Sequence, residues 1–587
     1  MTHTNTLFYG DNLTLLRDRA YFPDASVDLV YLDPPFNSNR SYNVLFRDES
    51  GRDSDAQITA FEDSWHWGRG TEDLYADLVT GSDERLVRLL GALVGGKDET
   101  GLLGRNQMSA YLVMMAARLA ELHRVLRPSD SLYLHCDPTA SHYLKLVLDT
   151  IFGEWNFRSE IIWKRHAHSH SLGAKQWPAI HDVLLMYSGG DTWVWNTQYE
   201  QYSEEYVKQS FRYSDERGAY QAYPITGARP GGPEAYAAWR GIRPSPGRAW
   251  ALPRHSLFPK WLDLPPEKEW RELGVHTKLD LLDNLGMIHW PKKKGGQPTL
   301  KRYLNDAPGK IMEGVWTEIG VRVGTKERLG YPTQKPLALL ERIIRASSNP
   351  GDVVLDPFCG CGTAIDAAQG LERRWLGIDV THLSVALMKY RLQDRHNLRA
   401  GRDYRVIGEP QDLAGARNLA EQEQDGRYQF QWWALSLVGA RPLGSTGSSR
   451  RGKKGADGGV DGVIHFLDEN KRAQRVVVQV KSGKVSRRDI GDLRGRLQGG
   501  VYPASGEASG AAIAVFITLE PPTGPMQQEA ISAGHYESEI WGRFPRLQIL
   551  TIEDLLDGKM VEMPTEHGTF RQAPRAREER DAQGRLL

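Results

Sequence analysis

A short proline-containing string near the start of the chain, DPPF at Asp33–Phe36, carries residue types that suit chemistry at the exocyclic amine of a nucleobase. Such an amine is a poor nucleophile because its lone pair is delocalised into the ring. The Asp33 carboxylate and the Pro34 carbonyl can accept its N–H groups while the nitrogen becomes tetrahedral. Phe36 offers an aromatic face to a base that has left the stack, and Pro34 and Pro35 stiffen the loop. A strand-ending turn with an exposed Asp33 is the alternative.

A second string, DPFCGCGT at Asp356–Thr363, has the composition of a nucleotide-binding loop. It follows the apolar run PGDVVLD and precedes the helical pattern AIDAAQGL. Between a strand and a helix, Gly360 and Gly362 allow the backbone to approach a nucleotide-like ligand closely. The next predicted strand, 374–378, ends at Asp379, which is placed to bind ribose hydroxyls. The chain has no three-glycine GxGxxG at this loop, which argues against a dinucleotide.

The elements around both strings alternate between strand and helix patterns. Residues 26–32, SVDLVYL, predict a buried parallel strand that ends directly at Asp33. A helical pattern at 109–125, a strand pattern at 131–135 and an amphipathic segment at 141–152 follow. This alternation predicts a doubly wound α/β sheet, in which ligands bind at the carboxyl ends of the strands.

Two further strings, YPTQKP at Tyr331–Pro336 and LGIDV at 376–380, complete a set of four motifs. Together they resemble the motifs of beta-class amino methyltransferases that act on DNA adenine, most of all the modification subunits of Type III restriction systems. The resemblance covers roughly residues 1–400. It implies a Rossmann-like α/β methyltransferase with permuted motif order, made of a first half at 1–190 and a second half at 321–400.

The resemblance implies S-adenosylmethionine as the cofactor. The cofactor would contact Asp356, Phe358, Gly360 and Gly362, with its ribose at Asp379, its methionyl end near Thr333, Gln334 and Lys335, and its adenine end at Asp11. A motif that begins DPP and not SPP favours adenine N6 over cytosine N4 as the target. Cys361 stands where the family more often has serine, and metal binding by Cys359 and Cys361 is disfavoured because no further cysteine is nearby. The family commonly forms homodimers.

The segment between the two halves, 191–320, is predicted to be an inserted target-recognition region that binds double-stranded DNA. Residues 201–310 hold 18 Lys and Arg against 12 Asp and Glu, together with 14 aromatic residues. Basic side chains neutralise phosphates, and arginine and aromatic planes can read or replace bases. Aromatic residues and arginines lie close together in the sequence at Tyr236, Trp239, Arg240, Arg243, Arg248, Trp250, Arg254 and Trp261. An irregular domain whose aromatics form its own core is the alternative for most of these aromatics.

Three histidines at alternate positions, His166, His168 and His170, precede this insert. On a strand they would share one face and could bind a metal ion. Because the sequence offers no obvious acidic partner, a polar loop near DNA phosphate is the favoured interpretation.

A second possible active site lies in the C-terminal part, where a linker at 401–425 is predicted to lead into a domain at 426–560. The pattern predicts a helix at 430–439, a strand ending near Phe466 and a strand at 475–480. Asp461 and Gln479 could hold Mg²⁺, and Lys481, on the same strand face as Gln479, could orient or deprotonate water.

The strings GADGGVDG and VVVQVKSG resemble the Mrr-like branch of the PD-(D/E)XK nuclease superfamily. The resemblance implies an α/β restriction-endonuclease-like domain. Gln479 stands where most of the superfamily has Glu, and Gln431 occupies a helix position where an acidic residue often sits. An inactive domain that serves DNA binding or assembly is therefore the alternative. Cleavage of methylated or of unmethylated DNA also remains open.

The bulk composition limits the classes of protein that this chain can be. Its 587 residues are 40% hydrophobic and 25% charged, with zero net charge, so any affinity for DNA must come from local patches. No apolar run approaches the ~20 residues that span a bilayer. The first residues lack the pattern of a signal peptide, and three cysteines, Cys136, Cys359 and Cys361, exclude a disulfide framework. We expect a cytoplasmic protein with no membrane segment and a disordered tail at 561–587.

Overall fold

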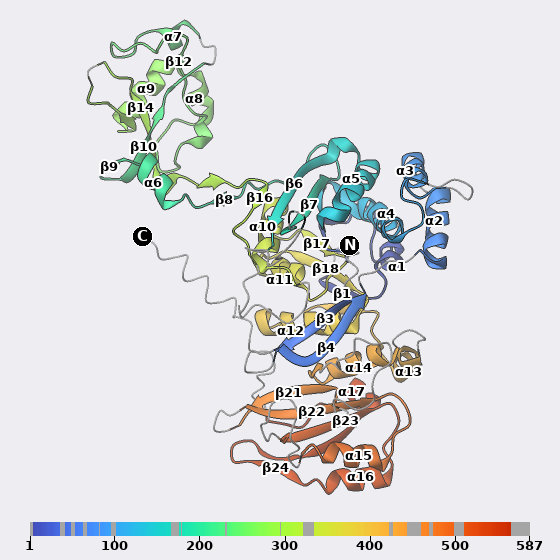
Figure 1. Ribbon diagram of the computed structural model, residues 1–587. Helices are drawn as coiled ribbons and strands as arrows, with labels where there is room; N and C mark the ends of the chain where they lie inside the picture. The colour runs from blue at the N-terminus through green and yellow to red at the C-terminus, as the bar shows by residue number, and fades with distance from the viewer. Residues whose placement is uncertain are drawn as a thin grey trace. The chain divides into compact units, whose positions relative to one another are not determined.

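The computed structural model describes residues 4–35, 41–47, 53–62, 67–81, 83–95, 101–165, 175, 177, 179–228, 232–293, 295–320, 334–421, 426–442, 460–468, 473–497 and 510–564. A nine-stranded mixed sheet lies at the centre of the methyltransferase-like part (Figure 1). In spatial order its strands are β16 (Val315–Trp316), β6 (Phe157–Lys164), β7 (His181–Ser188), β5 (Leu126–Cys136), β2 (Val27–Leu32), β17 (Val353–Asp356), β18 (Arg374–Asp379), β1 (Thr6–Tyr9) and β19 (Arg405–Ile407).

The middle of this sheet joins segments from the two ends of the domain. β17 pairs in parallel with β2, where Val354 lies opposite Leu29, and with β18, which in turn pairs in parallel with β1. Every residue of β2 and of β17 is buried, which explains why their sequences are apolar apart from Asp28 and Asp356. The predicted permuted α/β sheet is therefore confirmed.

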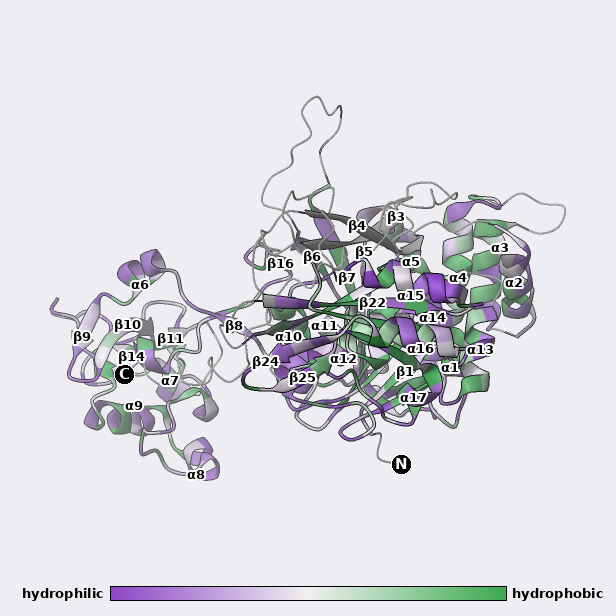
Figure 2. Cartoon of the chain, turned by 90° about the horizontal axis from the view of Figure 1, so that it is seen from below, coloured by the Kyte–Doolittle hydropathy of each residue, from purple (hydrophilic) through white to green (hydrophobic). Residues whose placement is uncertain are grey.

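Helices cover both faces of the sheet. One face packs against α1 (Asn12–Arg17), α3 (Glu84–Val94), α4 (Gln107–Val125) and α5 (Pro138–Phe152). The other face packs against α10 (Leu337–Ser347), α11 (Thr363–Gly370) and α12 (His382–His396). Figure 2 shows that the helix α3 carries both hydrophobic and hydrophilic residues. The predicted helices near 109–125, 141–152 and 364–371 are thus present, and α5 begins three residues early because Asp137 caps it ahead of Pro138.

Smaller elements complete this part of the chain. They are the hairpin β3 (Ser41–Arg47) and β4 (Asp53–Glu62), the helix α2 (Arg69–Gly81) and the 3₁₀ turn η1 (Glu154–Asn156). None of the helices in the described ranges is long and apolar enough to cross a membrane.

Residues 197–313 form a separate compact unit. Its four-stranded antiparallel sheet runs in the order β13 (Ile288–His289), β14 (Thr299–Tyr303), β10 (Gly218–Pro224) and β9 (Tyr213–Asp215). Its other elements are β8 (Tyr199–Glu200), α6 (Glu204–Ser210), β11 (Thr226–Gly227), α7 (Pro233–Tyr236), β12 (Ala249–Trp250), η2 (His255–Leu257), α8 (Glu267–Glu272), α9 (Val275–Asn284), η3 (Leu304–Asp306) and β15 (Lys310–Ile311). Trp239 and Trp250 belong to the core of this unit, whereas Tyr236 and Trp261 are about half exposed.

The C-terminal domain is a five-stranded sheet with a hydrophobic core on each face. Its strands lie in the order β20 (Arg441–Pro442), β21 (Gly462–Leu467), β22 (Ala473–Lys481), β23 (Ile513–Thr518) and β26 (Leu547–Thr551). The remaining elements are α13 (Leu413–Glu421), α14 (Gly426–Leu437), α15 (Arg487–Arg494), α16 (Gly524–Ile531), β24 (His535–Ser538), β25 (Gly542–Pro545) and α17 (Ile552–Leu556). The predicted strands at 475–480 and ending near Phe466, and the helix near 430–439, are present.

Two predicted boundaries look different in the structure. The segment 401–425, expected to be a linker, contains β19, which extends the central sheet, and α13, whose Ala416 and Leu419 belong to the C-terminal core. Met563, in the expected tail 561–587, is buried against that same core, and residues 565–587 lie outside the described part. His166, His168 and His170 also lie outside it.

Candidate active site

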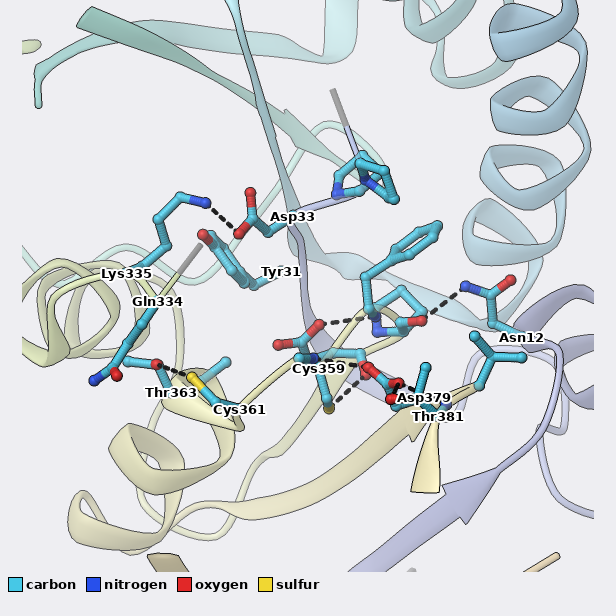
Figure 3. Close-up of a pocket in the computed structure, with 18 of the residues that line it drawn as sticks. Asn12, Tyr31, Asp33, Gln334, Lys335, Cys359, Cys361, Thr363, Asp379 and Thr381 are labelled. Carbon is cyan, nitrogen blue, oxygen red and sulfur yellow. Dashed lines mark hydrogen bonds and ion pairs between the residues drawn. The ribbon is translucent and has the colours of Figure 1, made fainter. Parts of the chain in front are cut away.

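A cavity of about 270 Å³ opens where four neighbouring parallel strands end (Figure 3). β2 leads to Asp33, β17 ends at Asp356, β18 ends at Asp379, and β1 leads to Asp11. The predicted site residues that line the cavity are Asp11, Asp33, Pro34, Pro35, Gln334, Lys335, Asp356, Phe358, Gly360 and Asp379. Phe36 and Thr333 lie outside the described residues.

The glycine loop is held in shape by the carboxylates at its two flanking strand ends. Asp356 Oδ1 accepts a hydrogen bond from the Phe358 N–H at 3.0 Å, and Asp379 Oδ2 accepts one from the Gly360 N–H at 2.9 Å. Gly360 has a φ of +52°, in the left-handed region that favours glycine. The loop therefore turns back at Gly360 and presents its backbone to the cavity.

Gly362, which was predicted to contact the cofactor, packs against α12. It does not belong to the cavity lining, and its φ of +75° marks the start of α11. A Cβ at this position would lie 2.5 Å from Met388 Cγ on α12. Close packing of α12, together with the backbone conformation, accounts for a glycine here without a ligand.

The floor of the cavity is acidic. Asp379 also accepts hydrogen bonds from the Thr381 N–H and hydroxyl, at 2.9 and 3.0 Å. Burial raises the pKa of Asp379, and it raises the pKa of Asp356 well above its usual range, with the charges of Asp33 and Asp379 adding to the effect. A bound cation would stabilise the ionised forms of both carboxyls, so this floor suits a positively charged ligand.

Asp11 is fixed by contacts on both of its carboxylate oxygens. One oxygen caps α1 by accepting the Thr14 N–H at 2.9 Å, and the other accepts from Arg118 Nη2 at 2.7 Å. Next to it, Asn12 Nδ2 donates to the Pro357 carbonyl at 2.8 Å. These contacts link β1 and α4 to the start of the glycine loop.

Asp33 is positioned by an ion pair at the edge of the cavity. Its Oδ2 pairs with Lys335 Nζ, and the two side chains are only 16% and 11% exposed. Its Oδ1 is buried and has no hydrogen-bond partner among the described residues. This oxygen is thus an available acceptor for a ligand N–H.

Three buried residues behind Asp33 form a chain that sequence reasoning missed. The Tyr31 hydroxyl lies 3.0 Å from His135 Nδ1, and His135 Nε2 lies 3.0 Å from Asp182 Oδ2. Asp33 Oδ1 is 3.9 Å from His135 Nδ1. Strand alternation could have indicated Tyr31, which lies two residues before Asp33 and so faces the same side. His135 and Asp182 come from β5 and β7, and their contact depends on the pairing of those strands.

The C-terminal domain places Asp461 beside the strand that carries Gln479 and Lys481. Asp461 Oδ2 accepts the Val480 N–H at 2.6 Å, and Asp461 Oδ1 accepts Gln431 Nε2 at 2.9 Å. Gln479 and Lys481 flank Val480 on β22 and share the opposite face of that strand from it. Asp461 and Gln479 carry side-chain oxygens, which are the ligand atoms that Mg²⁺ prefers. This ion usually keeps several bound waters as well. No cluster of three or more His, Cys, Asp or Glu suited to a metal occurs in the part of the chain that the structure covers.

Comparisons with known proteins match both parts of the chain. The DNA methylase family model matches residues 27–389, and the Mrr-type restriction endonuclease model matches residues 428–540. Both motif-based resemblances are thereby confirmed.

Three characterised relatives match the methylase part. Type II methyltransferase M.EcaI from Enterobacter cloacae is 28% identical over 380 residues, 64% of this chain and 66% of M.EcaI. The Mod subunit of the Type III restriction-modification enzyme StyLTI from Salmonella typhimurium strain LT2 is 27% identical over 380 residues, 63% of this chain and 50% of the subunit. DNA adenine methyltransferase YhdJ from Escherichia coli K12 is 44% identical over 93 residues, 15% of this chain and 32% of YhdJ. The chain thus spans half to about two thirds of the length of the first two.

Proposed function

The chain belongs to the DNA methylase family, and we propose that it transfers a methyl group from S-adenosylmethionine to adenine N6 in double-stranded DNA. One observation carries the proposal. Asp33 and the glycine loop that starts at Asp356 begin at the ends of adjacent strands and line one cavity. A group that binds the amine and a loop that binds the donor therefore face the same space.

The residues of the cavity fit the proposed donor. S-adenosylmethionine carries a sulfonium and an ammonium, and when bound it supplies an electrophilic methyl group. The buried Asp356 and the partly buried Asp379 favour a cationic ligand, and Asp379 would bind the ribose hydroxyls. Phe358 and the Gly360 backbone would contact the nucleoside, Asp11 would lie toward its adenine, and Gln334 and Lys335 toward its methionyl end.

Adenine is the favoured target because of the residues around Asp33. The free Oδ1 can accept one N–H of the amine, and the carbonyl of Pro34 can accept the other, which restores electron density to the nitrogen. The DPP start and the similarity to the adenine methyltransferase YhdJ support N6 over the N4 position of cytosine. Phe36 would stack on the flipped base.

Transfer and target base can be tested in one experiment. The full chain is incubated with unmethylated duplex DNA and tritiated S-adenosylmethionine, and the DNA is then digested to nucleosides and separated. We expect label in N6-methyladenine, and no label with Asp33→Asn. The matched control, Asp191→Asn, changes an exposed aspartate outside the cavity and should keep full activity. Label in N4-methylcytosine would correct the base, and no label in any nucleoside would refute methyl transfer.

The unit at 197–313 is proposed to select the DNA target. Its sequence is basic, since residues 201–310 contain 18 Lys and Arg against 12 Asp and Glu. Arg243, Arg254 and the half-exposed Tyr236 and Trp261 are available at its surface. Trp239 and Trp250 are excluded as direct contacts because they form its core.

For the C-terminal domain we propose Mg²⁺-dependent cleavage of DNA. The observation in favour is that Asp461 binds the backbone N–H of Val480, the residue between Gln479 and Lys481 on β22. Asp461 and Gln479 would supply oxygen ligands, and the Lys481 ammonium would orient the attacking water or stabilise charge on the phosphate. An inactive domain that only binds DNA or supports assembly is the second candidate, favoured by the neutral Gln431 and Gln479.

A cleavage assay separates these two candidates. Plasmid DNA in unmethylated and fully methylated forms is incubated with the full chain and MgCl₂. We expect cleavage of one of the two forms, and loss of cleavage in Lys481→Ala. Lys484→Ala, in the exposed segment just after β22, is the matched control and should still cut. If the DNA stays intact in every sample while the protein still methylates DNA, the result would favour a C-terminal domain without nuclease activity.

A further inference from the structure

Arg118 places a charge inside the helix α4, whose other buried positions are all uncharged. Its side chain is only 11% exposed, and burial lowers the pKa of the guanidinium, an effect that the carboxylate of Asp11 opposes. Taking a guanidinium out of water costs free energy unless its N–H groups find acceptors. The acceptors that Arg118 binds therefore decide where it can act.

These acceptors lie at the wall of the cavity. Arg118 Nη2 donates to Asp11 Oδ2 at 2.7 Å, and Arg118 Nε donates to Asn12 Oδ1. A third bond, from Nη1 to the Met114 carbonyl at 3.3 Å, stays within α4. Arg118, Asp11 and Asn12 all line the cavity. Two of the three bonds thus hold side chains of the cavity wall.

The bond to Asn12 sets the direction of its amide. Because a guanidinium only donates, Asn12 must turn Oδ1 toward Arg118, which leaves Nδ2 to donate elsewhere. Nδ2 donates to the Pro357 carbonyl at 2.8 Å, at the start of the glycine loop, and Figure 3 shows the Asn12 amide directed at this loop. Arg118 thereby ties the corner after β1 to the glycine loop.

Asp11 keeps room for one more donor. An ionised carboxylate has about four acceptor positions, two on each oxygen. The Thr14 N–H and hydroxyl occupy Oδ1, at 2.9 and 3.1 Å, and Arg118 occupies one position on Oδ2. The Asp11 side chain is 48% exposed. Oδ2 can therefore accept an N–H from a ligand in the cavity while Arg118 holds it in place.

The order of the strands indicates which part of the donor would lie at Asp11. β2, β17, β18 and β1 are consecutive neighbours in the sheet. A methyl donor must bring its methyl group to Asp33, after β2, and its ribose would lie at Asp379, at the end of β18. The base would then lie beyond the ribose, at the end of β1.

We propose that Arg118 is a positioning residue that holds Asp11 Oδ2 as an acceptor for the exocyclic amine of the adenine in S-adenosylmethionine. The inference rests on the proposed function of the cavity. It adds a selectivity, because a 6-aminopurine offers an N–H to this oxygen, whereas a 6-oxopurine would set a second acceptor against it. Two facing acceptors form no hydrogen bond and both lose contact with water.

The test compares two ligands that differ at this one group. S-adenosylhomocysteine and S-inosylhomocysteine, which carries an oxo group in place of the amine, are titrated calorimetrically into the full chain. We expect wild-type protein to bind the adenosyl compound about 10- to 100-fold more tightly, the range for a hydrogen bond to a charged group. Arg118→Met should reduce this preference by about 10-fold, because the carboxylate is no longer held in place.

Arg124→Met is the matched control. Arg124 lies on the same helix, is 17% exposed, and donates to the carbonyls of Leu16 and Phe22, outside the cavity lining. Its replacement should leave the preference for the adenosyl compound at the wild-type value. A purely structural role of Arg118 would weaken both ligands equally, so an unchanged ratio of affinities in Arg118→Met would overturn the proposal.

A second variant keeps the test decisive if Arg118→Met does not fold. Asp11→Asn retains a good cap for α1, since asparagine also accepts the N–H groups at a helix start. Its amide can donate to an oxo group, so the preference should fall or invert. An unchanged preference in Asp11→Asn, or equal binding of both ligands by wild type, rejects the inference alone. If wild type binds neither S-adenosylhomocysteine nor S-adenosylmethionine, the proposed function itself fails.

Discussion

Replacement of Gly362 by alanine tests whether this glycine is required by the fold or by a bound ligand. Its φ of +75° lies in the left-handed region, where a residue with a Cβ costs roughly 1–2 kcal/mol. A Cβ there would lie 2.5 Å from Met388 Cγ, and overpacking a dense core costs about 1–3 kcal/mol. We therefore expect Gly362→Ala to lower the local free energy of unfolding by roughly 2–5 kcal/mol.

Two other glycines separate the two contributions. Gly351 has a φ of +89° and open space where a Cβ would lie, so Gly351→Ala should show the backbone cost alone. Gly377 has no positive φ, but its Cβ would lie 2.7 Å from Cys359 Sγ, so Gly377→Ala should show the packing cost alone. The loss in Gly362→Ala should approach the sum of the two.

Hydrogen exchange followed by mass spectrometry is the assay, because it reports the stability of individual segments in a chain of several domains. We expect faster exchange in β17, α11 and β18 for Gly362→Ala, while peptides from 197–313 remain unchanged as an internal reference. The reasoning is refuted if Gly362→Ala keeps wild-type protection in these segments and only weakens binding of S-adenosylmethionine. That result would mean that Gly362 faces the ligand.

Three further predictions concern charge. Burial raises the pKa of Asp130 to about 6, whereas in the unfolded chain this carboxyl loses its proton near pH 3.8. The free energy of unfolding should therefore fall as the pH rises from 3.8 to about 6. In urea unfolding, Asp130→Asn should reduce this dependence of stability on pH. Asp366, 3% exposed, binds His396 Nε2 at 2.7 Å, so Asp366→Asn should cost roughly 3–5 kcal/mol, measured by exchange in α11 and α12. Exposed Lys292 and Lys293, changed together to alanine, should reduce the salt dependence of DNA binding by about 1.8 in log–log slope; an unchanged slope would show that they do not contact phosphate.

Sequence patterns predicted the strands that are buried on both faces. β2 and β17 are mostly apolar because helices cover each side of the sheet, and an aspartate that lines the cavity stands at the end of each strand. Their adjacency does not follow from periodicity, since a strand pattern does not specify its neighbours. It followed from the motif resemblance, and the pairing of Leu29 with Val354 confirms it.

The residues that sequence reasoning missed depend on tertiary register. Tyr31, His135 and Asp182 lie on three strands, and a shift of one residue in any of them would turn its side chain to the other face. Gly362 shows the converse difficulty. A glycine in a nucleotide-type loop indicates close approach, and the structure shows that Met388 lies where a Cβ of this residue would point.

The order of the two motifs along the chain has no effect on the chemistry, because hydrogen bonding and not sequence places the strands. Since β17 pairs with β2 at the roughly 5 Å spacing of neighbouring strands, Asp356 and Asp33 both lie at the same edge of the sheet. The proposed donor and acceptor sites, on adjacent strands, would need no hinge to meet. The same adjacency brings two carboxyls together. Burial is the largest cause of the raised pKa of Asp356, and the charge of Asp33 raises it further. A cation is needed at this point, and Lys335, at the start of the segment that leads into α10, supplies it by pairing with Asp33.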